Sequence, residues 1–197
     1  MEKIVSSVLQ ANKAVAKKVA NAFGGQPNVT RFWDDRQQNA VDILKCEDRP
    51  VSNVTSYATV NLSNWPLFFQ GEEYNARTEI LGACRSEVAE FSNVIATAAF
   101  CVINSRWFCC PGTIFPNVVS MYKCSDALKH LFFVPPFLWE ENLPTLQLDD
   151  RKVAWLLAVP ISDSERELAV RESPAKLEEL FVHRQIDIFD INRTPEI

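Results

Sequence analysis

Two short apolar runs in the C-terminal half constrain the fold of this chain more than any other feature. They are Leu131–Val134 and Val153–Val159, and each is followed by proline, at Pro135-Pro136 and at Pro160. Apolar runs of this length, bounded by residues that break regular structure, are typical of buried strands. The sequence therefore predicts two neighbouring central strands, each stopped by its proline.

Further helices and strands are predicted around this pair. Ser162-Asp163-Ser164-Glu165 supplies an N-cap and an acidic first turn that open a helix. In all, we expect helices at 2–23, 86–104, 162–171 and 174–182, and further strands at 28–33, 40–46, 53–62, 76–84, 118–122 and 186–191. Hairpin-length connections favour antiparallel pairing. The predicted fold class is α+β (mixed α/β), a single domain with a mostly antiparallel central sheet flanked by helices.

Motifs on these elements resemble the SUFU (suppressor of fused-like) domain family. From Leu131 to Arg193 the chain follows the family's order of apolar strand, proline pair, tryptophan, second apolar strand, Pro-Ile-Ser, Leu-Glu-x-Leu-Phe and Asp-Ile-x-Asp-x-x-Arg. Thr55–Ser63 is similar to its T-x-Y-x-T-x-G-L-S strand and turn, with Asn61 in the glycine position. Asparagine tolerates a left-handed backbone next best after glycine. Arg77–Ile80 is similar to its R-x-E-[IL] strand.

The resemblance implies both a domain organisation and a function. It implies a SUFU-like domain at 27–193, preceded by an amphipathic helix at 1–26 that packs on this domain. The bacterial members that this chain resembles are immunity proteins, or antitoxins, of polymorphic toxin systems. The resemblance therefore implies an immunity protein that binds and neutralises a cognate toxin in the producing cell.

The charge of the chain suggests which partner such a protein binds. Of the net charge of −5, residues 140–197 contribute −6, with thirteen acidic and seven basic side chains. An acidic surface repels nucleic acid and membranes and attracts basic proteins. Because a nuclease must be basic to bind its polyanionic substrate, we expect a basic toxin domain, a nuclease, as the partner. No direct nucleic acid, no membrane and no small-molecule ligand is expected.

Cysteine usage and the N-terminal segment favour a cytoplasmic protein. Lys13, Lys17 and Lys18 interrupt the stretch where a secretory signal needs a continuous apolar run. The sequence contains no run of 18 apolar residues, so no transmembrane helix is predicted. The six cysteines include no CxxC pair, which is typical of free thiols in a reducing compartment.

Patterns that would indicate an enzyme are weak. Cys124 and His130 have a spacing that fits no standard zinc site. Cys109-Cys110 lacks the flanking residues of a known cysteine hydrolase. Adjacent acids such as Asp149-Asp150 diverge on a strand or helix instead of facing one substrate. We therefore expect no enzyme activity, no catalytic or metal-binding residue and no cofactor.

The candidate partner-binding residues lie in loops. They are Glu140, Glu141, Asp149 and Asp150, which border the loop between the two central strands, and Trp65 in a proline-containing loop. Loops on a rigid scaffold often carry binding residues, although acids that only solvate a surface have the same pattern. Trp65 and Trp139, each near a proline, are expected at the surface.

Two other functions fit the same sequence. One is a scaffold or regulatory binding module of the SUFU type, which is the role the domain has in animals. The other is a cysteine-dependent hydrolase. Its only candidate nucleophiles and bases are Cys109, Cys110, His130 and His183.

Overall fold

The computed structural model describes the chain from residue 2 to residue 197, with side-chain environments from residue 8 onward. Its helices are α1 (Glu2–Phe23), α2 (Phe91–Ser105), α3 (Asp163–Arg171) and α4 (Pro174–Arg184), with 3₁₀ turns at Leu62–Asn64 and Ser120–Tyr122. Its strands are β1 (Pro27–Trp33), β2 (Ala40–Cys46), β3 (Val54–Thr59), β4 (Phe68–Phe69), β5 (Glu72–Glu73), β6 (Ala76–Arg85), β7 (Ile114–Phe115), β8 (Leu128–Val134), β9 (Leu146–Gln147) and β10 (Lys152–Ser162).

One mixed sheet organises the molecule. Its strands follow the order β1-β2-β3-β6-β10-β8-β7, with β9 paired to β10, and β4-β5 forms a separate small hairpin. Among the described strands, all pairs are antiparallel except β6 with β10. The two apolar runs are neighbours in the interior of the sheet, with Phe133 at 0% and Leu156 at 3% exposure. The predicted α+β class with a mostly antiparallel sheet is confirmed.

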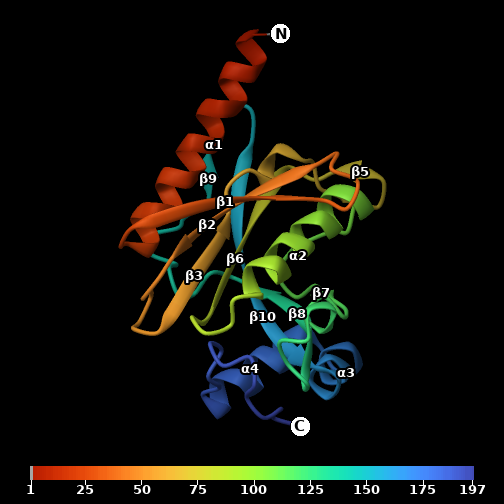
Figure 1. The fold of residues 1–197 in the computed structure, drawn as a ribbon. Coiled ribbons are helices and arrows are strands. Elements are labelled where there is room, and N and C mark those ends of the chain that lie inside the picture. The colour runs from red at the N-terminus through yellow and green to blue at the C-terminus, as the bar shows by residue number, and fades with distance from the viewer. Residues whose placement is uncertain (1) are drawn as a thin grey trace.

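Alternating side chains along the strands build a core on each face of the sheet. Leu156 and Ala158 of β10 belong to the core under α2, whereas Trp155 and Leu157 belong to the core under α1. Helix α2 can approach closely because Gly82 in β6 lies beneath it: a Cβ there would stand 2.8 Å from atoms of the side chains above. Figure 1 shows α1 and α2 on either side of the sheet, and α3 and α4 at the end that holds the C-terminus.

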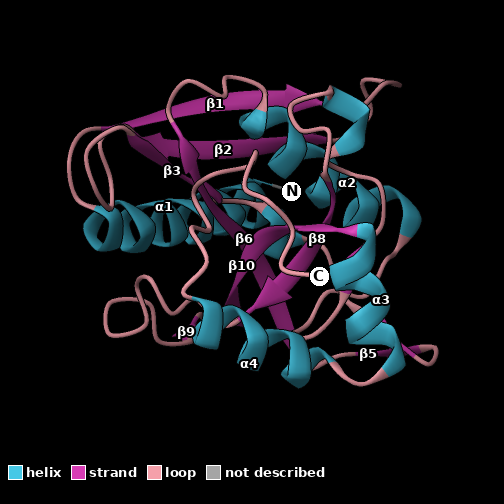
Figure 2. Ribbon diagram, turned by 90° about the horizontal axis from the view of Figure 1, so that it is seen from below, coloured by secondary structure: helices cyan, strands magenta, loops and turns pink. Residues whose placement is uncertain are grey.

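Helix α1 packs on the sheet through its C-terminal half. Val15, Val19 and Phe23 are buried there, whereas Leu9 is 54% exposed. The N-terminal part of α1 extends beyond the edge of the sheet, so that the two chain ends lie at opposite ends of the molecule (Figure 1). Seen from below, along the direction that joins these two ends, the N- and C-terminal labels both lie near the middle of the molecule (Figure 2).

Pro160 does not end its strand, which corrects one prediction. Strand β10 continues through Pro160 to Ser162, and Pro160 lies opposite Leu131 of β8. The pairing of β10 with β6 ends at Leu157, so the N–H that proline lacks is not required by β6. Because β10 has no described partner strand on that side at this point, it tolerates a proline that the sequence pattern predicts to end the strand.

The predicted strands at 118–122 and 186–191 are also wrong. The first segment contains a 3₁₀ turn, and the second consists of consecutive turns. In the second, the Asp187 and Asp190 carboxylates accept the backbone N–H groups two residues ahead, a local bond that competes with strand pairing. Helix α2 begins later than predicted, at Phe91, because Ser86 bonds the Thr55 hydroxyl instead of capping a helix.

Candidate partner-binding site

The motif around Thr59, Leu62 and Ser63 encloses a buried carboxylate. Glu79 of β6 is fully buried and accepts hydrogen bonds from Thr59 Oγ1 (2.5 Å), Leu62 N (3.1 Å) and Ser63 N (2.9 Å). Desolvation raises the pKa of Glu79, and these donors oppose the shift. The carboxylate holds the turn after β3 against β6. Asn61, at φ −146°, needs no left-handed backbone there.

The C-terminal motif encloses a second buried carboxylate. Ser162 is the N-cap of α3, as predicted, and it forms a capping box with Glu165. Arg193 Nη1 and Nη2 donate to the two Glu165 carboxylate oxygens at 2.6 and 2.9 Å, and Nη2 also donates to the Pro160 carbonyl at 3.2 Å. Both motifs that carry the family resemblance therefore stabilise the interior, and neither presents a reactive group at the surface.

The cysteine side chains are poorly suited to nucleophilic chemistry. All six are free, and desolvation raises the pKa of each, to about 12 for Cys84 and about 11 for Cys101. A reactive cysteine requires a lowered pKa, because the thiolate is the nucleophile. These thiols are therefore protonated near neutral pH.

The histidine in β8 is already committed to hydrogen bonds. His130 is 2% exposed, and its Nδ1 accepts the Asn117 backbone N–H at 2.9 Å. The ring proton must then lie on Nε2, which donates to Asp163 Oδ1 at 2.9 Å. Neither ring nitrogen is free to accept a proton from a nucleophile. Within residues 8–197, no three His, Cys, Asp or Glu side chains gather in an arrangement that could hold a metal ion.

The acids at 140 and 141 lie on a loop that is firmly anchored. Both are exposed. The preceding Trp139 was expected at the surface, but it is 4% exposed, with its ring centroid 4.5 Å from that of Phe23 in α1. Further along, Trp155 Nε1 donates to the Pro144 carbonyl at 3.0 Å. The prediction for Trp139 is wrong because α1 covers a loop that looks open in the sequence.

The acids at 149 and 150 form the exposed turn between β9 and β10. Arg151 donates to Asp150 Oδ2 (2.7 Å) and to Asn64 Oδ1 (2.8 Å). This second bond ties the turn to the loop that holds Trp65, which is half-buried. The structure therefore brings Asp149, Asp150 and the Trp65 loop together, whereas Glu140 and Glu141 adjoin the C-terminal end of α1.

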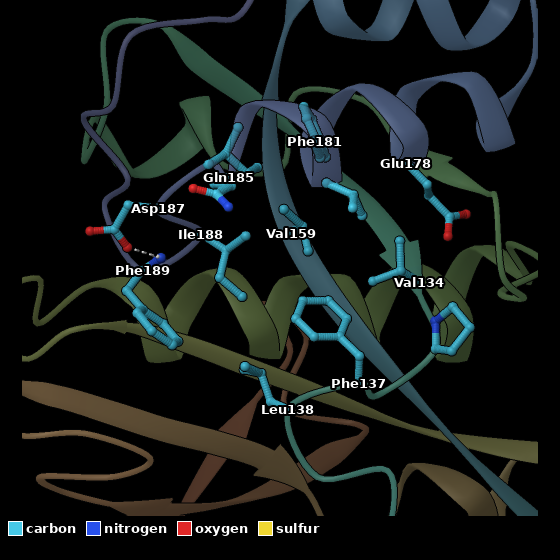
Figure 3. Close-up of a pocket in the computed structure, with 13 residues that line it drawn as sticks. Val134, Phe137, Leu138, Val159, Glu178, Phe181, Gln185, Asp187, Ile188 and Phe189 are labelled. Carbon is cyan, nitrogen blue, oxygen red and sulfur yellow. Dashed lines mark hydrogen bonds between the residues drawn. The ribbon is translucent and has the colours of Figure 1, made fainter.

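An apolar groove that the sequence did not predict lies beside the loop that carries Glu140 and Glu141. It has a volume of about 530 Å³ and opens between the start of the 135–145 loop, α4 and the turns after α4 (Figure 3). Phe137 and Leu138 form one side, and Phe181, Val182 and Ile188 contribute to the others. The apolar Phe137-Leu138 pair, directly after two prolines, is the one sequence signal that points to this groove.

Comparisons with known proteins identify similar sequences and folds. The sequence model of the suppressor of fused protein (SUFU) family matches residues 37–194. Immunity protein YqcF of Bacillus subtilis (strain 168) is 44% identical over 186 residues, which are 94% of this chain and 97% of that protein.

Solved structures share the fold at low sequence identity. A SUFU homologue from Neisseria gonorrhoeae is 15% identical with a TM-score of 0.68, and the match covers 96% of this chain and 98% of that chain. Drosophila Suppressor of Fused is 14% identical with a TM-score of 0.63, and the match covers 93% of this chain and 50% of that one. Among the residues that the structure describes, no helix has the length and apolar character to span a membrane.

Proposed function

The chain belongs to the suppressor of fused (SUFU) family, and from that premise we propose that it is an immunity protein that binds and neutralises a cognate toxin. The observation that carries the proposal is the 44% identity to immunity protein YqcF over nearly the whole of both chains. We place its action in the cytoplasm of the producing cell, where six free thiols stay reduced.

Binding without catalysis is the mechanism that the side chains support best. The buried carboxylates serve the scaffold, desolvation keeps the thiols protonated, and both nitrogens of His130 are hydrogen-bonded. A cysteine-dependent hydrolase would require a cysteine nucleophile with a free base beside it. An immunity protein requires only a surface that fits its toxin.

The toxin surface that fits best is basic, as expected for a nuclease. Glu140, Glu141, Asp149 and Asp150 are all exposed on one anchored connection between β8 and β10. Because the connection that carries these acids is anchored, they can present a negative potential to a positive surface, which speeds association and competes with nucleic acid. Trp65 follows Asn64, which Arg151 ties to this turn, and it supplies an aromatic side chain at this end of the proposed interface.

A protection experiment tests the proposal. Under this proposal the cognate toxin domain is encoded by the gene next to the gene for this chain, and that domain is the probe, produced in bacteria with and without the chain. We expect growth arrest with the toxin domain alone and restored growth when the chain is produced as well. Continued arrest in cells that contain folded chain contradicts the proposed function.

A charge-reversal variant tests separately whether the toxin binds the acidic connection, by which we mean the segment between β8 and β10 that carries Glu140, Glu141, Asp149 and Asp150. Asp149→Lys/Asp150→Lys should slow association with the neighbouring toxin domain about tenfold at low salt and flatten its salt dependence, with a smaller change in dissociation. The matched control is Asp35→Lys/Asp126→Lys, which changes the net charge equally at two exposed acids whose side chains form no hydrogen bond with described residues. Stopped-flow kinetics that show equal slowing in both variants would place the interface elsewhere.

A further inference from the structure

We propose that the apolar groove beside the acidic connection receives an apolar segment of the toxin, with a basic side chain of that segment placed against Glu178. This inference rests on the proposed function and adds to it the position and the chemistry of the anchoring contact.

The groove leaves large apolar side chains unusually open to solvent. Phe137 is 52% exposed and Val182 is 78% exposed, on the loop and on α4 respectively. Val159 of β10 and Phe181 also line the groove, which therefore reaches down to the sheet and to the core (Figure 3). Interfaces are usually anchored where an apolar side chain of one partner fills a pocket of the other.

The charged residues that line the groove favour a bound segment with a basic side chain. The only charged residues among those that line it are Glu178 and Asp187, and both are acidic. Asp187 is paired with Arg85 at 2.5 Å, whereas Glu178 forms no ion pair with any residue from 8 to 197. Partial burial raises the pKa of Glu178, as expected for a carboxylate that lacks a cationic partner. A basic side chain beside the apolar anchor would supply that partner.

The groove and the acids at 140 and 141 are close to each other along the chain. A single residue, Trp139, separates Phe137-Leu138 from Glu140-Glu141, and its ring is fixed against Phe23. A basic toxin drawn to Glu140 and Glu141 therefore arrives beside the groove. A second copy of this chain is a poorer occupant, because it would bring its own acidic surface against Glu178.

Polar substitution on an exposed wall of the groove tests the inference. We expect Val182→Gln to weaken binding of the neighbouring toxin domain about tenfold, measured as Kd by titration calorimetry. The control is Val170→Gln on α3, a valine that is 74% exposed and lies outside the groove, and it should leave Kd unchanged. Both side chains point into solvent, so both variants should keep the wild-type melting temperature.

A second pair of variants tests the charge contact. Glu178→Gln should weaken binding about fivefold, while Glu179→Gln, which removes an equal charge from the next residue outside the groove, should have little effect. If Val182→Gln and Glu178→Gln bind like wild type, the groove is not the anchor although the immunity function stands. If the wild-type chain itself fails to bind, the proposed function and this inference both fail. A dimer of this chain that Val182→Gln dissociates would show that the groove holds a second copy.

Discussion

Two buried carboxylates in this domain are satisfied in different ways. Glu165 has a full countercharge, because the Arg193 guanidinium donates to both of its oxygens. Glu79 has only dipolar donors, namely one hydroxyl and two backbone N–H groups. A buried charge without a countercharge is costly, so burial disfavours the ionised form of Glu79.

The raised pKa of Glu79 makes a prediction about stability and pH. Because the folded state binds this proton more tightly than the unfolded state, the stabilisation is complete below the unfolded value near 4.5 and is lost as pH rises through the folded pKa. Relative to Glu79→Gln, wild type should therefore lose free energy of unfolding as pH rises above the unfolded value. Groups whose pKa is lowered, such as Asp163, change both proteins alike. Urea unfolding that gives a pH-independent difference would contradict this account.

At the scale of elements, the C-terminal segment is joined to α3 by one buried ion pair. Ser162 ends β10 and caps α3, Glu165 completes the cap, and Arg193 reaches back from the chain end to bind Glu165. The same guanidinium lies 5.1 Å from the centre of the Phe181 ring in α4. Arg193 therefore connects α3, α4 and the end of β10.

Loss of Arg193 should consequently destabilise the whole domain. Arg193→Met leaves Glu165 buried without a countercharge, which should cost about 3–5 kcal/mol of unfolding free energy. Arg184→Met, at an exposed residue 3.8 Å from Glu196, should cost less than about 0.5 kcal/mol. Adding Glu165→Met to Arg193→Met should restore part of the loss. Chemical denaturation checks all three, and equal stability of the two single variants would refute the assignment.

Elements whose signals are local could be predicted from the sequence. The N-cap and acidic first turn of α3, the helix at 174–182 and the apolar runs in β8 and β10 can be predicted because neighbouring residues determine them. What depends on distant neighbours could not be predicted. Pro160 is tolerated because β6 has already diverged, and Trp139 is buried because α1 covers it.

At the scale of the whole molecule, the family motifs lie inside and the candidate binding features lie outside. The fold persists at 15% identity to the Neisseria gonorrhoeae homologue, so the interior pattern specifies an architecture and not a partner. The exposure of acids in a loop could be anticipated from charge alone. The groove could not, because it combines residues 134–138, α4 and the turns after it, whose proximity only the folded chain establishes.

The central claim is that the chain neutralises a toxin by binding it, and stoichiometry tests this most directly. Purified chain is titrated against a fixed amount of the neighbouring toxin domain in a cell-free expression system, whose reporter output falls when DNA or RNA is degraded. Inhibition by a one-to-one complex predicts that output recovers linearly and is complete at about one equivalent. Full recovery at a small fraction of an equivalent would indicate catalysis, and no recovery at a large excess would contradict the immunity function.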